Sequence, residues 1–329
     1  MLNNKRIFIT GGTGSFGKAF TKYAFENFDV KEIIIFSRDE QKQYKMMQEF
    51  SPKKYPIKYY LGDVRDKERL IDITKNVDIL IHSAAIKHVP MAELNPFECI
   101  KTNILGSQNV IDAAKINNIK KVVALSTDKA AMPINTYGAS KLLLEKLFVF
   151  ADKESEHTRF SVVRYGNIFG SKGSVIPFFL SVKKKGYLPV TDERMTRFSI
   201  TLQDSIDLVM FAIQEGWGGE VIVPIAPSYK ITDVAKAVAP DVPIKIIGKR
   251  VGEKLHEIMI SEEESLNCVK KNNFYVICPF DGRWDKEEYM KKSNASEYEE
   301  DGEYHSGKNK WWLSVEDIKR LIEEEEVIS

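Results

Sequence analysis

The stretch TGGTGSFG, Thr10–Gly17, decides the fold, because it connects a strand-forming run to the start of a helical one. The run before it, RIFIT at Arg6–Thr10, is rich in β-branched residues, and the segment after it, Ser15–Asn27, has helix length. Glycines at positions 11, 14 and 17 permit a tight turn, a close approach of the backbone to a pyrophosphate, and packing of helix on strand. Free N–H groups at the helix start then favour an anion. We expect these residues to bind a dinucleotide: Thr10, Gly11, Gly14, Ser15, Phe16 and Gly17.

Strand-like and helix-like segments alternate through the first half of the chain. The predicted strands are Arg6–Thr10, Glu32–Phe36, Ile57–Leu61, Asp78–His82, Lys121–Leu125 and Phe160–Arg164. The helix-length segments include Ser15–Asn27, Asp39–Phe50 and Pro96–Asn117. Most of these strands are apolar at nearly every position, as a parallel sheet covered on both faces requires. The alternation predicts an α/β fold with a Rossmann-type doubly wound parallel sheet.

The second half of the chain has shorter segments that prolines interrupt. We expect a dinucleotide-binding domain over residues 1–166 and a smaller, irregular C-terminal substrate-binding lobe over residues 167–329. One excursion back to the first domain is expected near residues 200–222, around Leu202–Gln214. The polar stretch Asp281–Lys310 is predicted to be a long loop, mobile or ordered by a ligand or partner. Ser314–Glu326 is predicted to be a closing helix with Ser314 as its N-cap.

The composition is ordinary for a globular protein: of 329 residues, 43% are hydrophobic and 29% charged, with a formal net charge of +1. No overall field therefore favours nucleic acid or an acidic membrane, and a few placed cations must bind any anionic substrate. No apolar run approaches the roughly 18 residues of a membrane span, and no signal peptide precedes the first strand, so we expect a cytoplasmic protein. Cys99, Cys268 and Cys278 lack metal-ligand spacing, and His82 and His88 lack partners, so no metal site is expected.

The choice of cofactor depends on the end of the second predicted strand. A fold that prefers NAD usually places Asp or Glu about 20 residues after the glycine turn, where it binds the ribose 2′-hydroxyl. This chain has Ser37 there, followed by Arg38, with Lys42 one turn later. A hydroxyl and two cations suit a 2′-phosphate and favour NADP, although Arg38 is also explained as a plain surface charge. Further cofactor contacts are expected after the third and fourth strands, at Asp63, Val64, Ala84, Ala85 and Lys87.

A tyrosine and a lysine follow the fifth predicted strand. Tyr137 and Lys141 are four residues apart at the start of a helical segment, so their side chains share one face. A nearby ammonium, together with the positive ring of the cofactor, lowers the pKa of a tyrosine, which then acts as a base toward a sugar hydroxyl. A surface Tyr–Lys pair is the alternative. The upstream glycine turn, and Ser126–Thr127 at a strand end, favour the catalytic interpretation.

These motifs resemble those of extended short-chain dehydrogenases that act on nucleotide sugars. The residues that carry the resemblance are TGGTGSFG, STDK at Ser126–Lys129 and YGASK at Tyr137–Lys141. Three further runs are similar to the inverting UDP-N-acetylglucosamine 4,6-dehydratases, which begin pseudaminic acid synthesis: AAIKHVPMAE at Ala84–Glu93, RYGNIFGSKGSVIPFF at Arg164–Phe179, and MTRF at Met195–Phe198. The likeness covers essentially the whole chain and is weakest in Asp281–Lys310.

The resemblance implies a reaction without net redox change, in which bound NADP takes hydride from sugar carbon 4 and returns it to carbon 6. Water leaves across carbons 5 and 6 in between. Asp128 would protonate the departing hydroxyl, and Lys129 would be the base at carbon 5, next to Thr127. Retaining relatives usually carry Asp-Glu where this chain has Asp128-Lys129. A lysine base must be neutral, and we expect burial and the cation Lys141 to favour that state.

The resemblance also implies the substrate, UDP-N-acetylglucosamine, and a homo-oligomer, often a hexamer. The substrate-binding residues that it implies are Lys87, Thr127, Asn167, Val175, Thr191, Met195, Arg197, Arg250, Glu253 and Asn309. Two other functions stay open. A UDP-sugar 4-epimerase would share the glycine turn, Tyr137 and Lys141, but would not need Asp128-Lys129. A non-catalytic NADP-binding scaffold would not need an intact Tyr137 and Lys141.

Overall fold

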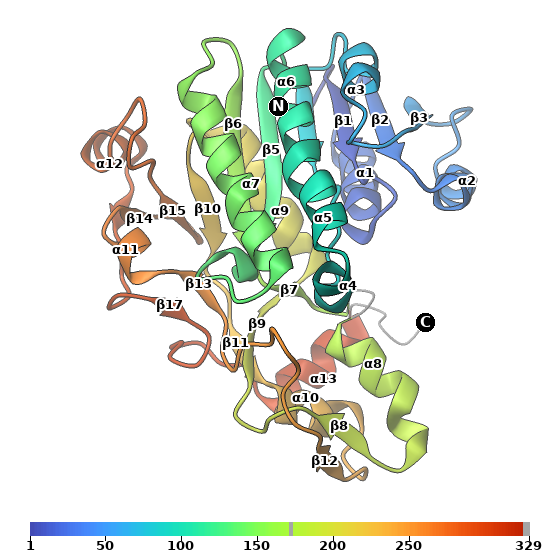
Figure 1. Cartoon of the computed structure of the whole chain (residues 1–329), viewed down its shortest axis with the longest axis vertical. Coiled ribbons are helices and arrows are strands. Elements are labelled where there is room, and N and C mark those ends of the chain that lie inside the picture. The colour runs from blue at the N-terminus through green and yellow to red at the C-terminus, as the bar shows by residue number, and fades with distance from the viewer. Residues whose placement is uncertain (171–173, 325–329) are drawn as a thin grey trace.

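The chain, described here by a computed structural model over residues 1–170 and 174–324, forms a large twisted sheet with a smaller lobe at one end (Figure 1). The large sheet has ten strands in the order β16-β14-β15-β10-β6-β5-β4-β1-β2-β3. Its parallel part comprises β1 (Arg6–Thr10), β2 (Glu32–Ser37), β3 (Ile57–Leu61), β4 (Ile79–His82), β5 (Lys121–Thr127), β6 (Arg159–Tyr165) and β10 (Val221–Pro224). The predicted α/β class with a doubly wound parallel sheet is confirmed.

Helices cover both faces of this sheet. On the face toward the viewer in Figure 1 lie α5, α6 and α7, and behind the sheet lie α1 and α9. The helices around the sheet are α1 (Ser15–Asn27), α2 (Glu40–Glu49), α3 (Lys67–Ile73), α4 (Val89–Leu94), α5 (Pro96–Cys99), α6 (Gly106–Ile116), α7 (Thr136–Lys153) and α9 (Leu202–Glu215). A short 3₁₀ turn, η2 (Asp128–Ala130), follows β5 directly. No helix within residues 1–170 and 174–324 is long and apolar enough to cross a membrane.

The predicted helix Pro96–Asn117 is wrong as a single element, because a π-helical turn, η1 (Ile100–Leu105), separates α5 from α6. The wider turn directs Asn103 inward, where the side chain is fully buried. Its amide oxygen accepts from the N–H of Ile86 at 2.8 Å, and its nitrogen donates to the carbonyl of Ile86 at 2.9 Å and to Ser140 Oγ at 2.9 Å. The π turn thus joins the segment after β4 to α7.

The large sheet receives two later returns of the chain rather than the single predicted excursion. Helix α9 and strand β10 form the expected one. The second return adds β14 (Cys268–Lys271), β15 (Phe274–Ile277) and β16 (Ser296–Glu297), all antiparallel. Strands β14 and β15 form a hairpin around Asn272 and Asn273, and Asn272 has a positive φ of 55° that this tight turn requires.

The stretch Asp281–Lys310 is not the predicted long loop, since it contains α12 (Lys286–Ser293), β16 and β17 (Tyr304–His305). Aromatic side chains hold it to the large sheet. Trp284 is 7% exposed and donates its indole N–H to the carbonyl of Gly218 at 2.7 Å, and Tyr289 packs edge-on to Trp217. These aromatic residues are spaced among many charged ones, so the average polarity of the stretch hides them.

The smaller lobe has its own apolar core, which includes Phe169, Phe179, Leu188, Val234 and Ile318. Its elements are α8 (Val175–Val182), η3 (Lys183–Lys185), α10 (Ile231–Val238), α13 (Val315–Glu324), and the paired strands β8 (Leu188–Val190) and β12 (Ile244–Ile246). Between the lobes lie β7 (Asn167–Ile168), β9 (Thr196–Ile200), β11 (Ser228–Lys230) and β13 (Ile258–Ile260), and α11 (Glu262–Ser265) lies beside β14 at the edge of the large sheet.

The closing helix α13 begins as predicted, with Ser314 Oγ accepting from the N–H of Asp317 at 3.1 Å. The last two residues of that prediction, 325 and 326, lie outside the described residues. The same holds for 171–173, within the run Arg164–Phe179 that carries part of the family resemblance.

Candidate active site

The glycine turn between β1 and α1 has a backbone that only glycine fits. Gly11 has a positive φ of 64°, and a Cβ there would lie 2.9 Å from the backbone of Ala84. A Cβ on Gly17 would lie 2.3 Å from the carbonyl oxygen of Gly12. Helix α1 therefore packs directly against the turn, and the turn packs against the end of β4.

The first turn of α1 is open to an anion. Its N-cap is Gly14, no side chain caps the helix start, and the first turn contains no acidic residue. The backbone N–H groups of Ser15 and Phe16 consequently lack a side-chain acceptor there, and the positive end of the helix dipole faces the turn. This cradle of backbone N–H groups fits a pyrophosphate.

Thr10 has a structural role in the turn. Its side chain is fully buried, and Oγ1 accepts from the N–H groups of Ser83 at 3.1 Å and Ala84 at 3.2 Å. The same oxygen lies 2.8 Å from Nδ1 of His82. Thr10 therefore joins β1 to the end of β4 and holds Ala84 against Gly11, rather than presenting its side chain to a ligand.

The end of β2 carries the two cations predicted to meet a 2′-phosphate. The Arg38 side chain is 56% exposed and lies 3.4 Å from Oδ2 of Asp63, while Lys42 lies 3.1 Å from Oδ2 of Asp39. Asp63 is held more closely by Arg65, at 2.7 Å. Both predicted cations are exposed and form only surface ion pairs, which contribute little to stability and which contact with a phosphate could replace.

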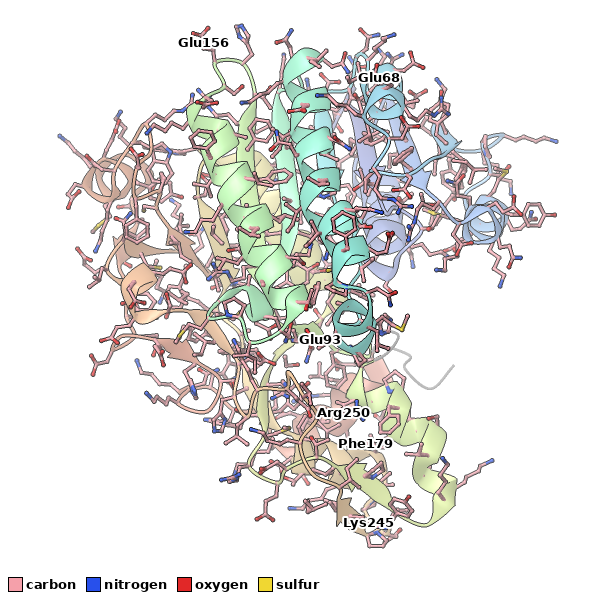
Figure 2. The ribbon with its side chains drawn as sticks, in the orientation of Figure 1. Glu68, Glu93, Glu156, Phe179, Lys245 and Arg250 are labelled. Atoms are coloured by element: carbon pink, nitrogen blue, oxygen red, sulfur yellow. The ribbon has the colours of Figure 1, made fainter. Side chains whose placement is uncertain are left out.

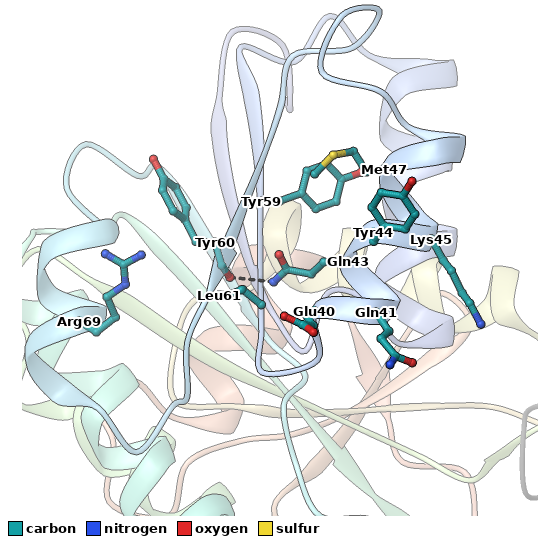
Figure 3. A pocket seen from close by; sticks show the side chains of 10 residues that line it. All are labelled: Glu40, Gln41, Gln43, Tyr44, Lys45, Met47, Tyr59, Tyr60, Leu61 and Arg69. Carbon is teal, nitrogen blue, oxygen red and sulfur yellow. Dashed lines mark hydrogen bonds between the residues drawn. The ribbon is translucent and has the colours of Figure 1, made fainter.

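A surface hollow of about 780 Å³ adjoins this region, between α2, β3 and α3 (Figure 3). Tyr44 and Tyr59 line one side, and Tyr60 and Arg69 line the other. Gln43 donates to the carbonyl of Tyr60 at 2.8 Å, which ties α2 to β3. The hollow neighbours the expected adenosine end of the cofactor. None of the predicted site residues lines it, so it does not include the catalytic residues.

The other predicted cofactor contacts follow β3 and β4. Val64 is buried, and a Cβ on Gly106 would lie 2.7 Å from its side chain. Ala84 and Ala85 are half-buried beside the glycine turn. Burial lowers the pKa of Lys87, and no charge on the described residues counters this effect. The segment after β4 therefore borders the glycine turn, where Ala84 packs against Gly11.

Tyr137 and Lys141 lie in the first two turns of α7, which Asn135 caps by accepting from the N–H of Gly138 at 2.8 Å. Lys141 is 3% exposed and donates to the carbonyl of Leu125 at 2.7 Å. Burial lowers the pKa of Lys141 to about 8, while Glu145 opposes this shift. The buried lysine is therefore anchored to the end of β5.

Lys141, which was expected to lower the Tyr137 pKa together with the cofactor ring, is not among the protein groups that act most strongly on this tyrosine. Burial raises the pKa of Tyr137 to about 12. The ammonium that opposes this rise belongs to Lys129, and the Thr127 hydroxyl acts in the same direction as Lys129. A further positive charge, such as the ring of an oxidised nicotinamide, is needed to make the phenolate accessible near neutral pH.

Asp128 lies at the centre of the site and is fully buried. Its Oδ1 accepts from Thr127 Oγ1 at 2.9 Å and from Lys129 Nζ at 2.9 Å. Its Oδ2 is buried and has no hydrogen-bond partner among the described residues, and it lies 3.5 Å from a Cβ built on Gly166. Because buried carboxylate oxygens are rarely left unpartnered, this oxygen is positioned to meet a ligand.

Lys129 is charged in this arrangement, which corrects the prediction that burial and Lys141 hold it neutral. Burial does disfavour its charge, but the carboxylates of Asp128 and Glu257 raise its pKa above the ordinary lysine value. The nearby cation is Arg197, not Lys141. Lys129 must therefore lose a proton before it acts as a base.

The predicted substrate residues lie in two groups. Asn167 and Arg197 belong to the catalytic group: Asn167 Oδ1 is 3.4 Å from Lys129 Nζ, and Arg197 is 6% exposed on β9. Glu253 adjoins them, 3.8 Å from Arg197. Thr191 donates to the buried sulfur of Met195 at 3.0 Å, so this pair packs inward.

The second group lies farther from Lys129. The N–H of Arg250 donates to Glu253 Oε2 at 3.2 Å, and in Figure 2 Arg250 lies between Glu93 of α4 and Phe179 of α8, at the junction of the lobes. Val175 begins α8. The Asn309 amide donates to the carbonyl of Ala226 at 2.8 Å and to Ser228 Oγ at 3.0 Å, so it anchors its own loop.

Three residues of the site were missed at the sequence level: Glu257, Tyr229 and Asn103. Glu257 is 2% exposed and lies 3.5 Å from both Lys129 and Arg197. Tyr229 is 4% exposed and pairs with Arg197 across β9 and β11. The local signal for Glu257 is a carboxylate directly before the apolar run that forms β13. The π turn that directs Asn103 inward has no sequence signature.

Comparison with known proteins places this geometry in context. Residues 7–279 match the family described as polysaccharide biosynthesis protein. A UDP-N-acetylglucosamine 4,6-dehydratase (inverting) of Campylobacter jejuni is 50% identical over 98% of both chains. A protein of Rickettsia bellii named UDP-glucose 4-epimerase is 41% identical over 98% of this chain and 96% of its own. The solved structure of Pen from Bacillus thuringiensis superimposes with a TM-score of 0.90 and 34% identity over 99% of both chains.

Proposed function

The chain belongs to the polysaccharide biosynthesis protein family, of the extended short-chain dehydrogenase type, and from this premise we propose that it is a hydro-lyase that dehydrates UDP-N-acetylglucosamine. The dehydration spans carbons 4 to 6 and inverts carbon 5, giving a 4-keto-6-deoxy sugar nucleotide. One observation carries the proposal. The hydrogen-bonded pair Asp128–Lys129, buried at the end of β5, lies beside Tyr137. A second acid–base pair next to the tyrosine is what removal of water requires and what simple oxidation does not.

The residues around the glycine turn fit a dinucleotide. The uncapped start of α1 leaves room for a pyrophosphate. The close packing at Gly11 and Gly17 admits no residue bulkier than glycine at those two positions. We assign NADP as the cofactor, because Arg38 and Lys42 are exposed at the end of β2 where a 2′-phosphate would lie. When bound, NADP would accept a hydride from carbon 4 and return it at carbon 6.

The side chains of the site divide the proton transfers between them. Tyr137 takes the proton of the carbon-4 hydroxyl. The buried Lys141, which is hydrogen-bonded to the end of β5, orients the ribose of the cofactor. Asp128 protonates the departing carbon-6 hydroxyl, and Lys129 removes the proton from carbon 5. Return of a proton to the opposite face of carbon 5 inverts that centre, and the L-configured product would then serve pseudaminic acid synthesis.

Substrate binding is assigned to the junction of the lobes. Asn167 and Arg197 would contact the sugar next to Lys129, and Lys87 and Thr127 would border it from the large sheet. Arg250 and Glu253 suit diphosphate and ribose respectively, because a guanidinium matches phosphate oxygens and a carboxylate accepts from hydroxyls. We accordingly propose residues 1–166 as the dinucleotide-binding domain and 167–329 as the substrate-binding lobe, with the two returns described above.

A homo-oligomer is proposed from the exposed apolar surface of the helices in front of the sheet. Leu94, Phe97, Leu105, Leu143 and Phe150 are each at least half exposed, on the packed helices α4 to α7. Exposed apolar side chains gathered on neighbouring helices are often covered in an assembly. Light scattering that shows a monomer at micromolar concentration would contradict this proposal.

The test is proton NMR of the purified protein with UDP-N-acetylglucosamine in heavy water. The expected result is loss of the carbon-5 proton, a new carbon-6 methyl group, and an L-configured 4-keto product. Lys129→Met should abolish the methyl signal, whereas the matched control Lys153→Met, an exposed lysine on α7, should keep it. A methyl group without inversion would show that Lys129 does not act as proposed.

Two other functions are distinguished by the same experiment. The Rickettsia relatives named UDP-glucose 4-epimerase favour epimerisation as the second candidate, and it predicts only the carbon-4 epimer and no methyl signal. A non-catalytic NADP-binding scaffold predicts no sugar conversion at all. Lys141→Met that loses turnover while NADP binding persists would contradict the scaffold.

A further inference from the structure

A carboxylate that the sequence did not single out lies at the centre of the site. Glu257 immediately precedes β13 and is 2% exposed. Its N–H donates to Ser306 Oγ at 2.9 Å, and its carbonyl accepts from the N–H of Ser306 at 2.9 Å. Because both sides of its peptide backbone are bonded to one residue, the position of the Glu257 side chain is fixed by the fold.

The Glu257 carboxylate is shared between two cations. Its Oε1 lies 3.5 Å from Lys129 Nζ and 3.5 Å from Arg197 Nε, and its Oε2 is buried without a hydrogen-bond partner among the described residues. Arg197 cannot follow a moving partner, since its Nη1 already donates to the carbonyls of Thr196 at 2.7 Å and Leu255 at 3.2 Å. The Glu257 carboxylate therefore keeps the Lys129 ammonium close to the guanidinium of Arg197, whose position is fixed.

Two cations and two carboxylates make up this buried cluster: Lys129, Arg197, Asp128 and Glu257. Their formal charges sum to zero, and Glu253, 3.8 Å from Arg197, and Lys254 add one charge of each sign at the edge of the cluster. The other titratable groups that face Lys129 are Tyr137 from α7, Tyr229 from β11 and Lys254 from the segment before β13. Removal of one carboxylate would leave the cluster with an uncompensated positive charge.

We propose that Glu257 is a positioning residue of the elimination step: its buried carboxylate, shared between Lys129 and Arg197, keeps one proton on the Asp128–Lys129 pair, which then acts as a single acid–base unit. This inference rests on the proposed dehydration. In the resting pair the proton is on Lys129 Nζ, and Asp128 is a carboxylate. The 2.9 Å hydrogen bond from Nζ to Oδ1 is the path by which the proton moves to Asp128.

The transfer produces the two forms that elimination needs. Lys129 becomes a neutral amine with a free electron pair, Asp128 becomes a neutral acid, and Arg197 and Glu257 remain as a balanced ion pair. The amine then takes the carbon-5 proton, the carbon 5–hydrogen electrons form the double bond, and the carbon 6–oxygen bond breaks. Asp128 gives its proton to the departing oxygen, which leaves as water. The pair ends as ammonium and carboxylate, its starting state.

Without the Glu257 anion, the guanidinium of Arg197 would face Lys129 without the carboxylate that both now share, and the more distant Glu253, 3.8 Å from Arg197, would remain as its carboxylate partner among the described residues. A cation at this distance disfavours a second positive charge, so Lys129 would lose its proton to solvent at lower pH. The pair would then lose its shared proton at lower pH than in the wild type. In the wild type, the carboxylates of Asp128 and Glu257 raise the Lys129 pKa above its ordinary value. Lys129 therefore keeps its proton throughout the physiological pH range.

The experiment compares the alkaline limb of the kcat/KM–pH profile for dehydration in three enzymes. Glu257→Gln should bring this limb to lower pH by about one to three units relative to the wild type, the effect of one nearby charge. Glu257→Asp, which restores the anion, should return the limb most of the way. Glu220→Gln is the matched control, because Glu220 is equally buried but lies before β10, away from the site, and its limb should stay in place. A limb that does not move in Glu257→Gln overturns the inference.

A second measurement uses the unmodified enzyme, so it does not depend on how Glu257→Gln folds. Nitrogen NMR of ¹⁵N-lysine-labelled protein, with the Lys129 signal identified by its loss in Lys129→Arg, should show this amine still charged where ordinary lysines titrate. Titration at or below the ordinary value overturns the inference. A wild type that gives no dehydrated product at any pH overturns the proposed function instead, and the charge state of Lys129 then still decides the role of Glu257.

Discussion

Glu220→Gln is expected to stabilise the protein above neutral pH, although most substitutions of buried residues destabilise proteins. Glu220 precedes β10 and is 1% exposed. Its Oε2 accepts from the N–H of Gly218 at 2.8 Å, but its Oε1 has no hydrogen-bond partner among the described residues. Burial raises the pKa of the Glu220 carboxyl to about 7, and the neighbouring Asp152 adds to this rise while Lys121 opposes it.

The magnitude follows from the different proton binding of the folded and unfolded chains. The carboxyl has its ordinary pKa of 4.5 when unfolded and a raised pKa of about 7 when folded, so the folded state keeps its proton longer. Stability is therefore greatest below the unfolded pKa and falls as pH rises through the folded pKa. At about 1.4 kcal/mol per unit, ionisation costs about 1 kcal/mol at about pH 5 and about 3 kcal/mol at about pH 8. Glutamine does not titrate and avoids this cost.

Urea denaturation followed by circular dichroism at about pH 5 and about pH 8 measures the effect. The stability of Glu220→Gln relative to the wild type should increase by about 2 kcal/mol between these conditions. The control is Glu156→Gln, an exposed carboxylate at the tip after α7 (Figure 2), for which the difference should not change with pH. A difference for Glu220→Gln that is the same at both values would refute the reasoning, because it would mean that the buried carboxyl has an ordinary pKa.

Three further substitutions test other parts of the molecule. Gly17→Ala should abolish NADP binding in calorimetry, because the added Cβ would lie 2.3 Å from a carbonyl oxygen of the glycine turn; wild-type affinity would contradict the packing described. Arg38→Asp should weaken NADP binding more than NAD binding, and an equal loss of both would remove the argument for the 2′-phosphate. Arg164→Met should cost about 3–5 kcal/mol of stability in urea, because it leaves the carboxylates of Glu145 and Glu264 without their buried cation; a loss below about 1 kcal/mol would argue against this network.

The first half of the fold was predictable because its signals are local. Strands such as β1 and β3 are short β-branched or aromatic runs, and the glycine turn sets the start of α1 directly. The family resemblance drawn from these motifs is confirmed by the 50% identical relative. The hairpin β14–β15 escaped prediction because its strands are four residues long and partly polar, so only pairing with β10 stabilises them.

The sequence predicted which residues of the candidate site lie together, but it did not predict their charge states. Tyr137, Asp128 and Lys129 do lie together, since the end of β5 and the start of α7 meet there. The charge on Lys129 depends on Glu257 and Arg197, which come from segments far along the chain. Sequence spacing carries no information on such encounters, because they arise only when the second lobe packs against the first.

The π turn Ile100–Leu105 has a consequence for insertions and deletions. A π turn absorbs one surplus residue of the chain, so the helices on either side keep the register that an uninterrupted α-helix would give them. Deleting a single residue there would restore a regular α-helix with α5 and α6 close to their present positions, but the wide turn that directs Asn103 inward would be lost. Asn103 would then turn away from Ile86 and Ser140. In alignments of related chains, a one-residue gap within this helix would therefore mark a rebuilt active-site wall, whereas gaps of that size in surface loops carry no such meaning.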